Sequence, residues 1–312
     1  MHQQPHRTPR PARWRAGVAG ALLASFLLLA GCSGGGRPAA RPAGGEGPGA
    51  TTAAPTTSPT TTGPAPPERS PAGATARELA ERITTAERAI RDPATPAGQL
   101  ADLGRGQQEA YRVIARKPRL LHEVLPLVAP TVRGVAKANA TAGIELRALS
   151  RPRADRPLPH WRVVAPAPAA ELLADYQAAG RNQGVPWQYL AAIHLVETRL
   201  GRIRGTSSAG AKGPMQFLPP TWRRYGAGGD INATRDAIMA AARFLRAHGA
   251  PTHMRAALFA YNRSSRYVRA VTAYAEQLRA DQRAFLGYYH WQVYFGDVLL
   301  PEGYPERPAR RS

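Results

Sequence analysis

The stretch AAIHLVETRLG, residues 191–201, places a single carboxylic acid among apolar side chains. Helical spacing puts Glu197 on or beside the face of Ile193 and His194, which is expected to pack into a core, with His194 as a packed imidazole. Burial disfavours the charged form of a carboxyl group and raises its pKa, and a carboxyl that stays protonated near neutral pH can act as a general acid. A salt bridge to one of the three arginines that follow Glu197 is the alternative left open by these residues.

No second acid accompanies Glu197 in the sequence that follows it. Residues 198–229 contain no Asp or Glu, and Asp230 lies in DINATRDAI, which is typical of a helix N-terminal cap region. Glycosidases of the paired-carboxylate kind need a second carboxyl group close to the first, so we expect Glu197 to act alone. His248 and His253 are separated by GAPT, which breaks a helical face, and the sequence therefore predicts no metal and no cofactor.

A glycine-rich loop, GTSSAGAKGPMQFLPPTW (residues 205–222), follows the acid. Small residues and glycines let a backbone come close to a ligand. Candidate ligand contacts are a thioether, an amide and an aromatic ring in this loop, then a tyrosine and an asparagine at a later helix end: Met215, Gln216, Phe217, Tyr261 and Asn262. Such a mixture of aromatic faces and amide groups is typical of sugar-binding sites.

These motifs occur in an order that resembles a known family. ET after an apolar helix, then SSAGAKGPMQF, then AYN is similar to the soluble lytic transglycosylase (SLT) superfamily, which has a goose-type-lysozyme-like fold. The pattern S-x-A-G-A-x-G-x-x-Q-F-x-P, together with DAIMAAARFLRAHG, resembles the transglycosylase B-like branch in particular. The resemblance covers roughly residues 170–280, about a third of the chain.

The resemblance implies a role for each matching position. Glu197 would protonate the β-1,4 glycosidic oxygen between N-acetylmuramic acid and N-acetylglucosamine, then act as base on the muramic acid 6-hydroxyl, closing a 1,6-anhydro ring. Assistance from the substrate's 2-acetamido group would fit the missing second carboxylate, with Ser207 approaching that group and Gln216 beside the scissile sugar. The remaining substrate-binding positions would be Thr198, Gly213, Met215, Phe217, Tyr261 and Asn262. Thr198 stands where the family usually has serine.

Two other functions remain open on the sequence. A hydrolytic muramidase would use the same cleft but admit water. A non-catalytic wall-binding scaffold lipoprotein would use its helical N-terminal region to recruit partners. The presence of Glu197, Ser207 and Gln216 favours an enzyme over a scaffold.

The start of the chain predicts export to the outer face of a membrane. Four arginines and no acid precede Gly17, an apolar run follows, and LAGC at residues 29–32 resembles a bacterial lipobox. We expect residues 1–31 to be a lipoprotein signal peptide and Cys32 to carry the lipid, leaving the protein anchored in the cell membrane and facing the cell wall. Cys32 is the only cysteine, which excludes an internal disulfide.

The rest of the chain predicts a tether and a mainly α fold. Residues 32–73 contain no Val, Leu, Ile or aromatic residue and are expected to form a disordered Pro/Gly/Thr-rich tether. Residues 74–150 are predicted to form a helical N-terminal region, with helices over 74–92, 97–118 and 119–149, the last broken near Pro130. A proline-rich linker, SRPRADRPLPHWRVVAPAP, leads to the lytic transglycosylase domain at 160–304, where only YYHWQVYFG resembles a strand. The fold class is a goose-type-lysozyme-like transglycosylase domain behind a helical N-terminal region.

The net charge of +21 favours polyanionic partners such as nucleic acid, anionic lipid or the cell wall. The sequence contains no zinc-finger, RNP or Walker spacing, so nucleic acid is not expected as a partner. The predicted partners are peptidoglycan glycan strands and, through the lipid anchor, the membrane. Recruitment of cell-wall proteins is the role that remains open for residues 74–150.

Overall fold

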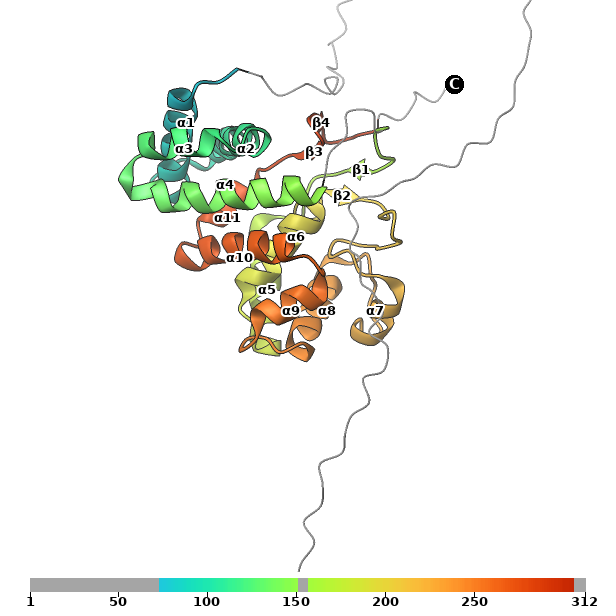
Figure 1. Cartoon of the computed structure of the whole chain (residues 1–312). Coiled ribbons are helices and arrows are strands. Elements are labelled where there is room, and N and C mark those ends of the chain that lie inside the picture. Colours follow the sequence, from blue (N-terminus) through green and yellow to red (C-terminus); the bar gives the residue numbers. More distant parts are fainter. Residues whose placement is uncertain (1–72, 151–156, 306–312) are drawn as a thin grey trace, which may run out of the picture.

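The computed structural model describes residues 73–150 and 157–305, and these are mainly helical (Figure 1). This confirms the predicted fold class. The predicted signal peptide, Cys32 and all but the last residue of the predicted tether lie outside the described residues. In the part of the chain that the structure does describe, no helix is both long enough and apolar enough to cross a membrane.

The N-terminal region forms four helices and two 3-10 turns: α1 (Ala76–Arg91), η1 (Ala97–Gln99), α2 (Leu100–Arg116), α3 (Leu120–Val124), η2 (Leu125–Leu127) and α4 (Pro130–Ser150). Thr75 and Glu78 form a capping box that starts α1, and α1 ends before Pro93 as predicted. The predicted break lies directly before Pro130, which opens α4 because its fixed φ suits the first position of a helix.

The C-terminal part contains seven helices and four short strands among its described residues: β1 (Arg162–Val163), α5 (Ala169–Gln183), α6 (Trp187–Thr198), β2 (Ile203–Arg204), α7 (Pro219–Tyr225), α8 (Thr234–Ala247), α9 (Met254–Tyr261), α10 (Ser265–Ala280), α11 (Ala284–Tyr289), β3 (Val293–Phe295) and β4 (Val298–Leu300). β3 confirms the strand predicted in YYHWQVYFG and pairs antiparallel with β4. β1 pairs antiparallel with β2, which places part of the predicted linker beside the start of the glycine-rich loop.

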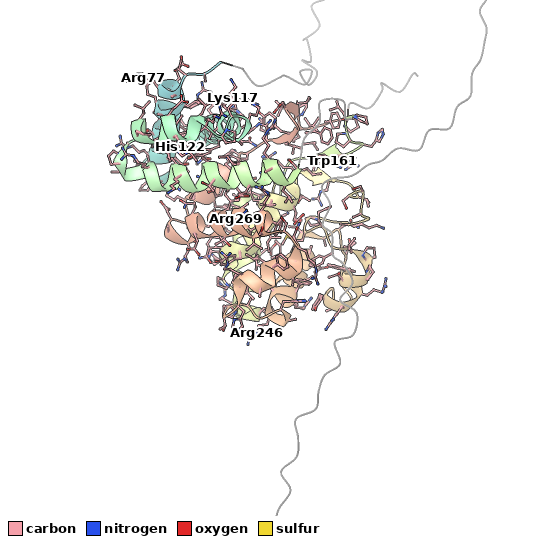
Figure 2. All side chains as sticks on the ribbon, viewed as in Figure 1. Arg77, Lys117, His122, Trp161, Arg246 and Arg269 are labelled. Atoms are coloured by element: carbon pink, nitrogen blue, oxygen red, sulfur yellow. The ribbon has the colours of Figure 1, made fainter. Side chains whose placement is uncertain are left out.

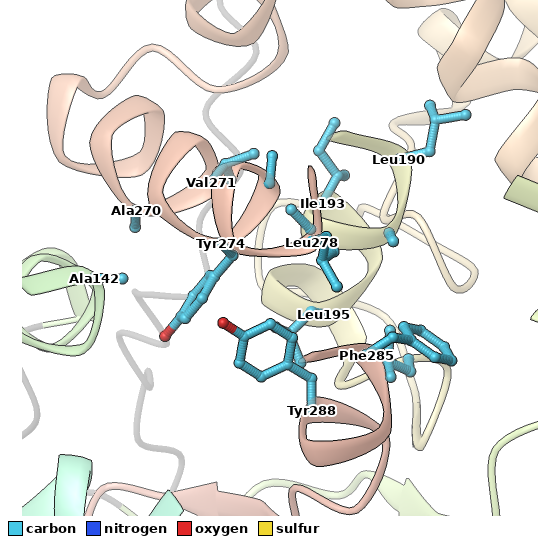
Figure 3. Close-up of a cluster of buried hydrophobic side chains, with 14 of the residues drawn as sticks. Ala142, Leu190, Ile193, Leu195, Ala270, Val271, Tyr274, Leu278, Phe285 and Tyr288 are labelled. Carbon is cyan, nitrogen blue, oxygen red and sulfur yellow. The ribbon is translucent and has the colours of Figure 1, made fainter. Parts of the chain in front are cut away.

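One continuous core joins the two helical regions. α4 runs along α10 (Figure 1), and in Figure 3 Ala142 of α4 lies next to Ala270 and Tyr274 of α10. Both alanines are completely buried, and such small side chains allow two helices to approach closely. α10 in turn packs on α6, whose Ile193 and Leu195 belong to the same cluster. The division between residues 74–150 and 160–304 is therefore not a division between two cores.

A buried polar network also crosses between the two regions. Glu87 of α1 is fully buried and accepts hydrogen bonds from the Tyr111 hydroxyl and, at 2.9 Å, from Nδ2 of Asn139. Its other oxygen pairs with Arg91. The hydroxyl of Tyr288 in α11 donates to Oδ1 of Asn139 over 2.6 Å. A buried carboxylate tolerates removal from water only when it is paired and hydrogen-bonded, so this network fixes α1, α2 and α4 against α11.

Candidate active site

Glu197 occupies the last turn of α6, and its side chain is almost completely removed from water. Most of α6 is buried, including Leu190, Ile193 and Leu195, so the helix enters the core with little solvent-facing surface. The residue after the helix, Arg199, has a left-handed backbone (φ 55°), which turns the chain into the glycine-rich loop. Glu197 is 2% exposed, as expected for an acid on a dry helical face.

Burial raises the pKa of Glu197 to about 7, and a hydrogen bond from Tyr267 opposes part of that rise. The Tyr267 hydroxyl lies 2.8 Å from Oε1 of Glu197. No described arginine forms an ion pair with Glu197: Arg202 pairs with Glu302, and the Arg199 guanidinium lies over the Trp291 ring. The salt-bridge alternative is therefore not the arrangement in this structure, and the acid is tuned by burial and one phenol.

Tyr267 was not predicted from the sequence. It lies three residues into the helix that follows AYN, where a tyrosine is indistinguishable from an ordinary core position of an amphipathic helix. Its ring stacks on that of Tyr261 with 6.4 Å between centroids and 6° between planes, and it is 1% exposed. A buried tyrosine hydroxyl normally has a hydrogen-bond partner. This rule is the one signal that could have indicated a polar group opposite Tyr267, once its burial was known.

Three of the predicted substrate-binding residues shape the loop from inside. Thr198 is fully buried, donates to the carbonyl oxygen of Pro214 over 2.6 Å and accepts from the Gly201 backbone N–H over 3.1 Å. Gly213 has φ +73°, and a Cβ there would lie 1.9 Å from the carbonyl oxygen of Ile231. Met215 is also fully buried. Both the Thr198 and Met215 side chains are buried in this structure, where Thr198 supports the loop, and their contacts with a substrate remain predictions.

Ser207 and Gln216 lie on the same loop and are held by its backbone. Oγ of Ser207, which is partly exposed, accepts a hydrogen bond from the Ala211 N–H over 3.0 Å. Nε2 of Gln216 donates to the Gly213 carbonyl over 2.9 Å. Gln216 adopts φ +51°, a left-handed conformation that costs a non-glycine residue energy and that clusters at functional sites. The loop therefore fixes both side chains before any ligand binds.

A small, partly open hollow with a volume of about 20 Å³, room for roughly one water molecule, brings several predicted residues together. Its lining consists of Ala211, Gln216, Phe217, Leu218, Thr221, Phe244 and Tyr261. Phe217 and Tyr261 meet edge to face with 5.7 Å between centroids, and the Tyr261 hydroxyl donates to the Met215 carbonyl over 2.6 Å. Asn262 follows at the end of α9 and is 7% exposed. An apolar wall with one amide has the composition of a ligand-binding surface, but the hollow itself is far smaller than a sugar ring.

His194, which precedes Glu197 by three residues in α6, has no acid–base role in this geometry. His194 is fully buried, its Nδ1 lies 2.6 Å from the Tyr176 hydroxyl, and burial lowers its pKa to about 3, so the ring is neutral. This places His194 in the core, as expected. Among the described residues, no group of three or more His, Cys, Asp or Glu side chains is arranged to hold a metal ion.

The fold and the site define a class of protein: a helical, lysozyme-like domain with a buried acid at the end of the helix that leads into a glycine-rich loop. Residues 175–283 match the family model described as the Transglycosylase SLT domain. The match begins within α5, ends directly before α11 and contains Glu197, Gln216 and Tyr267. It supports the SLT superfamily for this segment and suggests cleavage of glycosidic bonds in peptidoglycan. Neither the curated proteins nor the solved structures gave a match to the chain.

Proposed function

We propose that the protein is a peptidoglycan lytic transglycosylase of the transglycosylase B-like branch. It cleaves the β-1,4 bond between N-acetylmuramic acid and N-acetylglucosamine and leaves 1,6-anhydro-muramic acid ends, with Glu197 as the single acid and base. The observation that carries the proposal is the buried carboxyl of Glu197, with Tyr267 as its hydrogen-bond donor, within a segment that matches the SLT domain. The branch rests on the loop pattern between Ser207 and Pro219.

The reaction needs one proton to leave Glu197 and one to return. Protonated Glu197 gives its proton to the glycosidic oxygen as the bond from that oxygen to C1 of the muramic acid breaks. The muramic acid 6-hydroxyl then attacks C1, and the Glu197 carboxylate accepts the hydroxyl proton. No water is consumed, and the acid returns to its starting form. Because its pKa is about 7, Glu197 is suited to both roles near neutral pH.

Tyr267 contributes while Glu197 is ionised, between the two proton transfers of the reaction. A hydrogen bond to an ionised carboxylate is stronger than one to the neutral acid. The Tyr267 hydroxyl therefore stabilises the carboxylate that exists between the two proton transfers. Burial raises the pKa of Tyr267 well above its ordinary value, so this phenol donates its hydrogen bond and does not ionise itself.

The surroundings of Glu197 favour the transglycosylase over the hydrolytic muramidase. Both types of water-using glycosidase with paired carboxylates place their second carboxyl about 5–10 Å from the first. The ionisable side chains that interact electrostatically with Glu197 in the described structure are tyrosines, Tyr261 and Tyr267. Among the described residues, no carboxylate hydrogen-bonds to Glu197 or shifts its pKa, which supports a mechanism without a second acid.

We further propose that the protein is exported and lipid-anchored at Cys32, facing the cell wall. The support is the sequence alone, namely the arginine-rich start, the apolar run and LAGC at residues 29–32. A tether of 42 residues behaving as a flexible coil would separate the anchor from the folded part by about 35 Å. Such a reach would let the site work on glycan strands next to the membrane while the lipid stays inserted.

Mass spectrometry of muropeptides released from purified wall tests the proposed activity. The expected products end in 1,6-anhydro-muramic acid and are lighter than hydrolysed ends by the mass of one water. Reducing-end muramic acid as the main product would establish the hydrolytic muramidase instead. Binding to the wall without any released product would establish the scaffold. Glu197→Gln is the matched control, since it keeps the shape of the side chain and removes its acidic proton.

A further inference from the structure

We propose that α4 of the N-terminal region is part of the active-site framework, and that Glu145 is a positioning residue for Tyr267. Glu145 acts through Arg266 and Arg269, which flank Tyr267 in α10. The inference rests on the proposed function for the role of Glu197, and it assigns to residues 74–150 a task inside the enzyme. Partner recruitment is not needed to explain the presence of this region.

Glu145 of α4 forms ion pairs with two arginines of α10, Arg266 and Arg269. Its Oε1 lies 2.8 Å from Nε of Arg269 and its Oε2 lies 3.0 Å from Nη2 of the same guanidinium, a two-bond pair. Oε2 also accepts from Nη1 of Arg266 over 2.8 Å. The Glu145 side chain is only 15% exposed, and the hydrogen bond from Arg269 lowers its pKa, so it is ionised at neutral pH. Figure 2 labels Arg269 below α4.

The start of α10 carries positive charge that Glu145 partly offsets. The N-terminus of a helix carries a partial positive charge and is stabilised by nearby negative groups. The first turn of α10 contains no acidic residue and instead contains Arg266. Its cap, Ser264, accepts from the Tyr267 N–H at 3.4 Å, a long contact. Glu145 therefore offsets part of the positive charge that Arg266 and Arg269 add to this end of α10.

The same turn carries the group that contacts the catalytic acid. Tyr267 lies between Arg266 and Arg269 in the sequence, and its hydroxyl reaches Glu197 on the buried side of α10. One turn further along, Ala142 of α4 and Ala270 of α10 meet in the core (Figure 3). The first turns of α10 are thus held by α4 through an apolar contact and through a charged clamp, the ion pairs of Glu145 with Arg266 and Arg269. A shift of this turn moves the Tyr267 hydroxyl relative to Glu197.

The groups around Glu197 fix the expected sign of the effect on pH dependence. From α10 it faces the Tyr267 hydroxyl and from α9 it interacts with Tyr261, while His194 on its own helix is neutral. The hydrogen bond from Tyr267 lowers the pKa of Glu197. If the Tyr267 hydroxyl is held less firmly, the pKa of Glu197 rises, and the alkaline limb of the pH–rate profile moves to higher pH.

The test compares Glu145→Gln with Arg279→Gln in the full folded chain. Arg279 forms an exposed ion pair with Glu276 at the opposite end of α10, so its substitution removes a surface ion pair from the same helix. Glu145→Gln is expected to lower kcat about three- to tenfold and to move the alkaline limb up by about half a pH unit. Arg279→Gln is expected to leave both unchanged. Glu145→Asp should recover part of the loss.

Wild-type kcat and an unshifted profile in folded Glu145→Gln would overturn the inference, as would equal losses in Glu145→Gln and Arg279→Gln. Should Glu145→Gln fail to fold, the doubly substituted Arg266→Gln/Arg269→Gln protein removes the same clamp at exposed side chains and must show the same shift. Carbon-13 NMR titration of the Glu197 carboxyl, assigned by its loss in Glu197→Gln, reads the pKa without any substrate. A wild-type protein that cleaves nothing would refute the proposed function, while this titration would still decide the role of Glu145.

Discussion

Tyr267 donates a hydrogen bond to Glu197 across 70 positions of sequence, and among the described residues this is the only side-chain hydrogen bond that the buried acid receives from another helix. Hydrogen bonds to charged groups contribute about 1.5–3 kcal/mol. The contact therefore adjusts a carboxyl that burial alone would make too weak an acid. Loss of this hydrogen bond is therefore expected to change both the rate of cleavage and its pH dependence.

Tyr267→Phe removes the hydroxyl and keeps the ring that stacks on Tyr261. Cleavage is expected to slow about 10- to 100-fold, and the alkaline limb of the pH–rate profile to move up, because the pKa of Glu197 rises above about 7. Rates of muropeptide release between pH 5 and pH 9 measure both effects. Tyr189→Phe, which removes the part-buried hydrogen bond to Glu276, is the control with unchanged rates. A Tyr267→Phe protein with a normal profile would remove the phenol from the mechanism.

Glu197→Gln is expected to abolish cleavage and to change the pH dependence of stability. The pKa of Glu197 is about 7 when folded against an ordinary value of 4.5, so between these values the folded state binds more protons than the unfolded state. Wild-type stability therefore falls as pH rises from 4.5 to 7, by up to about 3 kcal/mol. Glu197→Gln lacks this loss. Its Tm should exceed that of the wild type more at pH 8 than at pH 4, and an equal difference at both would show that the acid is not desolvated.

Thr198 links the end of α6 to the loop, and two substitutions separate its hydroxyl from its shape. Thr198→Val keeps the volume but leaves the Pro214 carbonyl and the Gly201 N–H without their partner. Each unsatisfied buried group costs about 1–3 kcal/mol, so urea unfolding should show a clear loss of stability and activity should fall with it. Thr198→Ser keeps both bonds and should stay close to the wild type. Equal stability of the two variants would contradict the assigned role.

These results show how far the sequence predicted the site. The apolar pattern around Glu197 predicted a buried acid, because helical periodicity is a local property. It did not predict which loop residues point inward. Thr198 and Met215 carry side chains that suit a ligand, and only the folded backbone shows that both face the protein interior. Tyr267 was missed for the same reason, since its partner lies on another helix.

The relation between the two helical regions was also hidden in the sequence. The helices of residues 74–150 were predicted close to their observed bounds, with the break at Pro130. The surface by which α4 meets α10, however, contains alanines such as Ala142 and the charged Glu145. Neither type of residue is identified as part of a packing face by the periodicity of large hydrophobic side chains. Periodicity finds helices, but close approach through small residues becomes visible only when both helices are present.

Gly213 and Gly210 form a matched pair in the loop. Both have positive φ, +73° and +81°, but only at Gly213 would a Cβ collide, with the Ile231 carbonyl at 1.9 Å, while Gly210 has no atom within 4 Å of that position. Gly210→Ala is expected to cost about 1 kcal/mol for the backbone alone, and Gly213→Ala clearly more, because the loop must move. Unfolding midpoints and cleavage rates measure the difference. Equal effects would show that the close approach at Ile231 is not required.

Asn139 tests whether the helical regions unfold together. Asn139→Ala leaves the Tyr288 hydroxyl without its acceptor and removes one donor from buried Glu87, so we expect a loss of about 2–4 kcal/mol. Because the core is continuous, the loss should appear as a lower midpoint of one cooperative transition, with cleavage activity lost at the same temperature as helicity. Asn182→Ala, at an exposed position of α5, is the control with an unchanged midpoint. Two separate transitions, or activity that outlasts unfolding of the N-terminal helices, would show that α1–α4 fold apart from the site, and would also remove the structural basis for a role of Glu145 in positioning Tyr267.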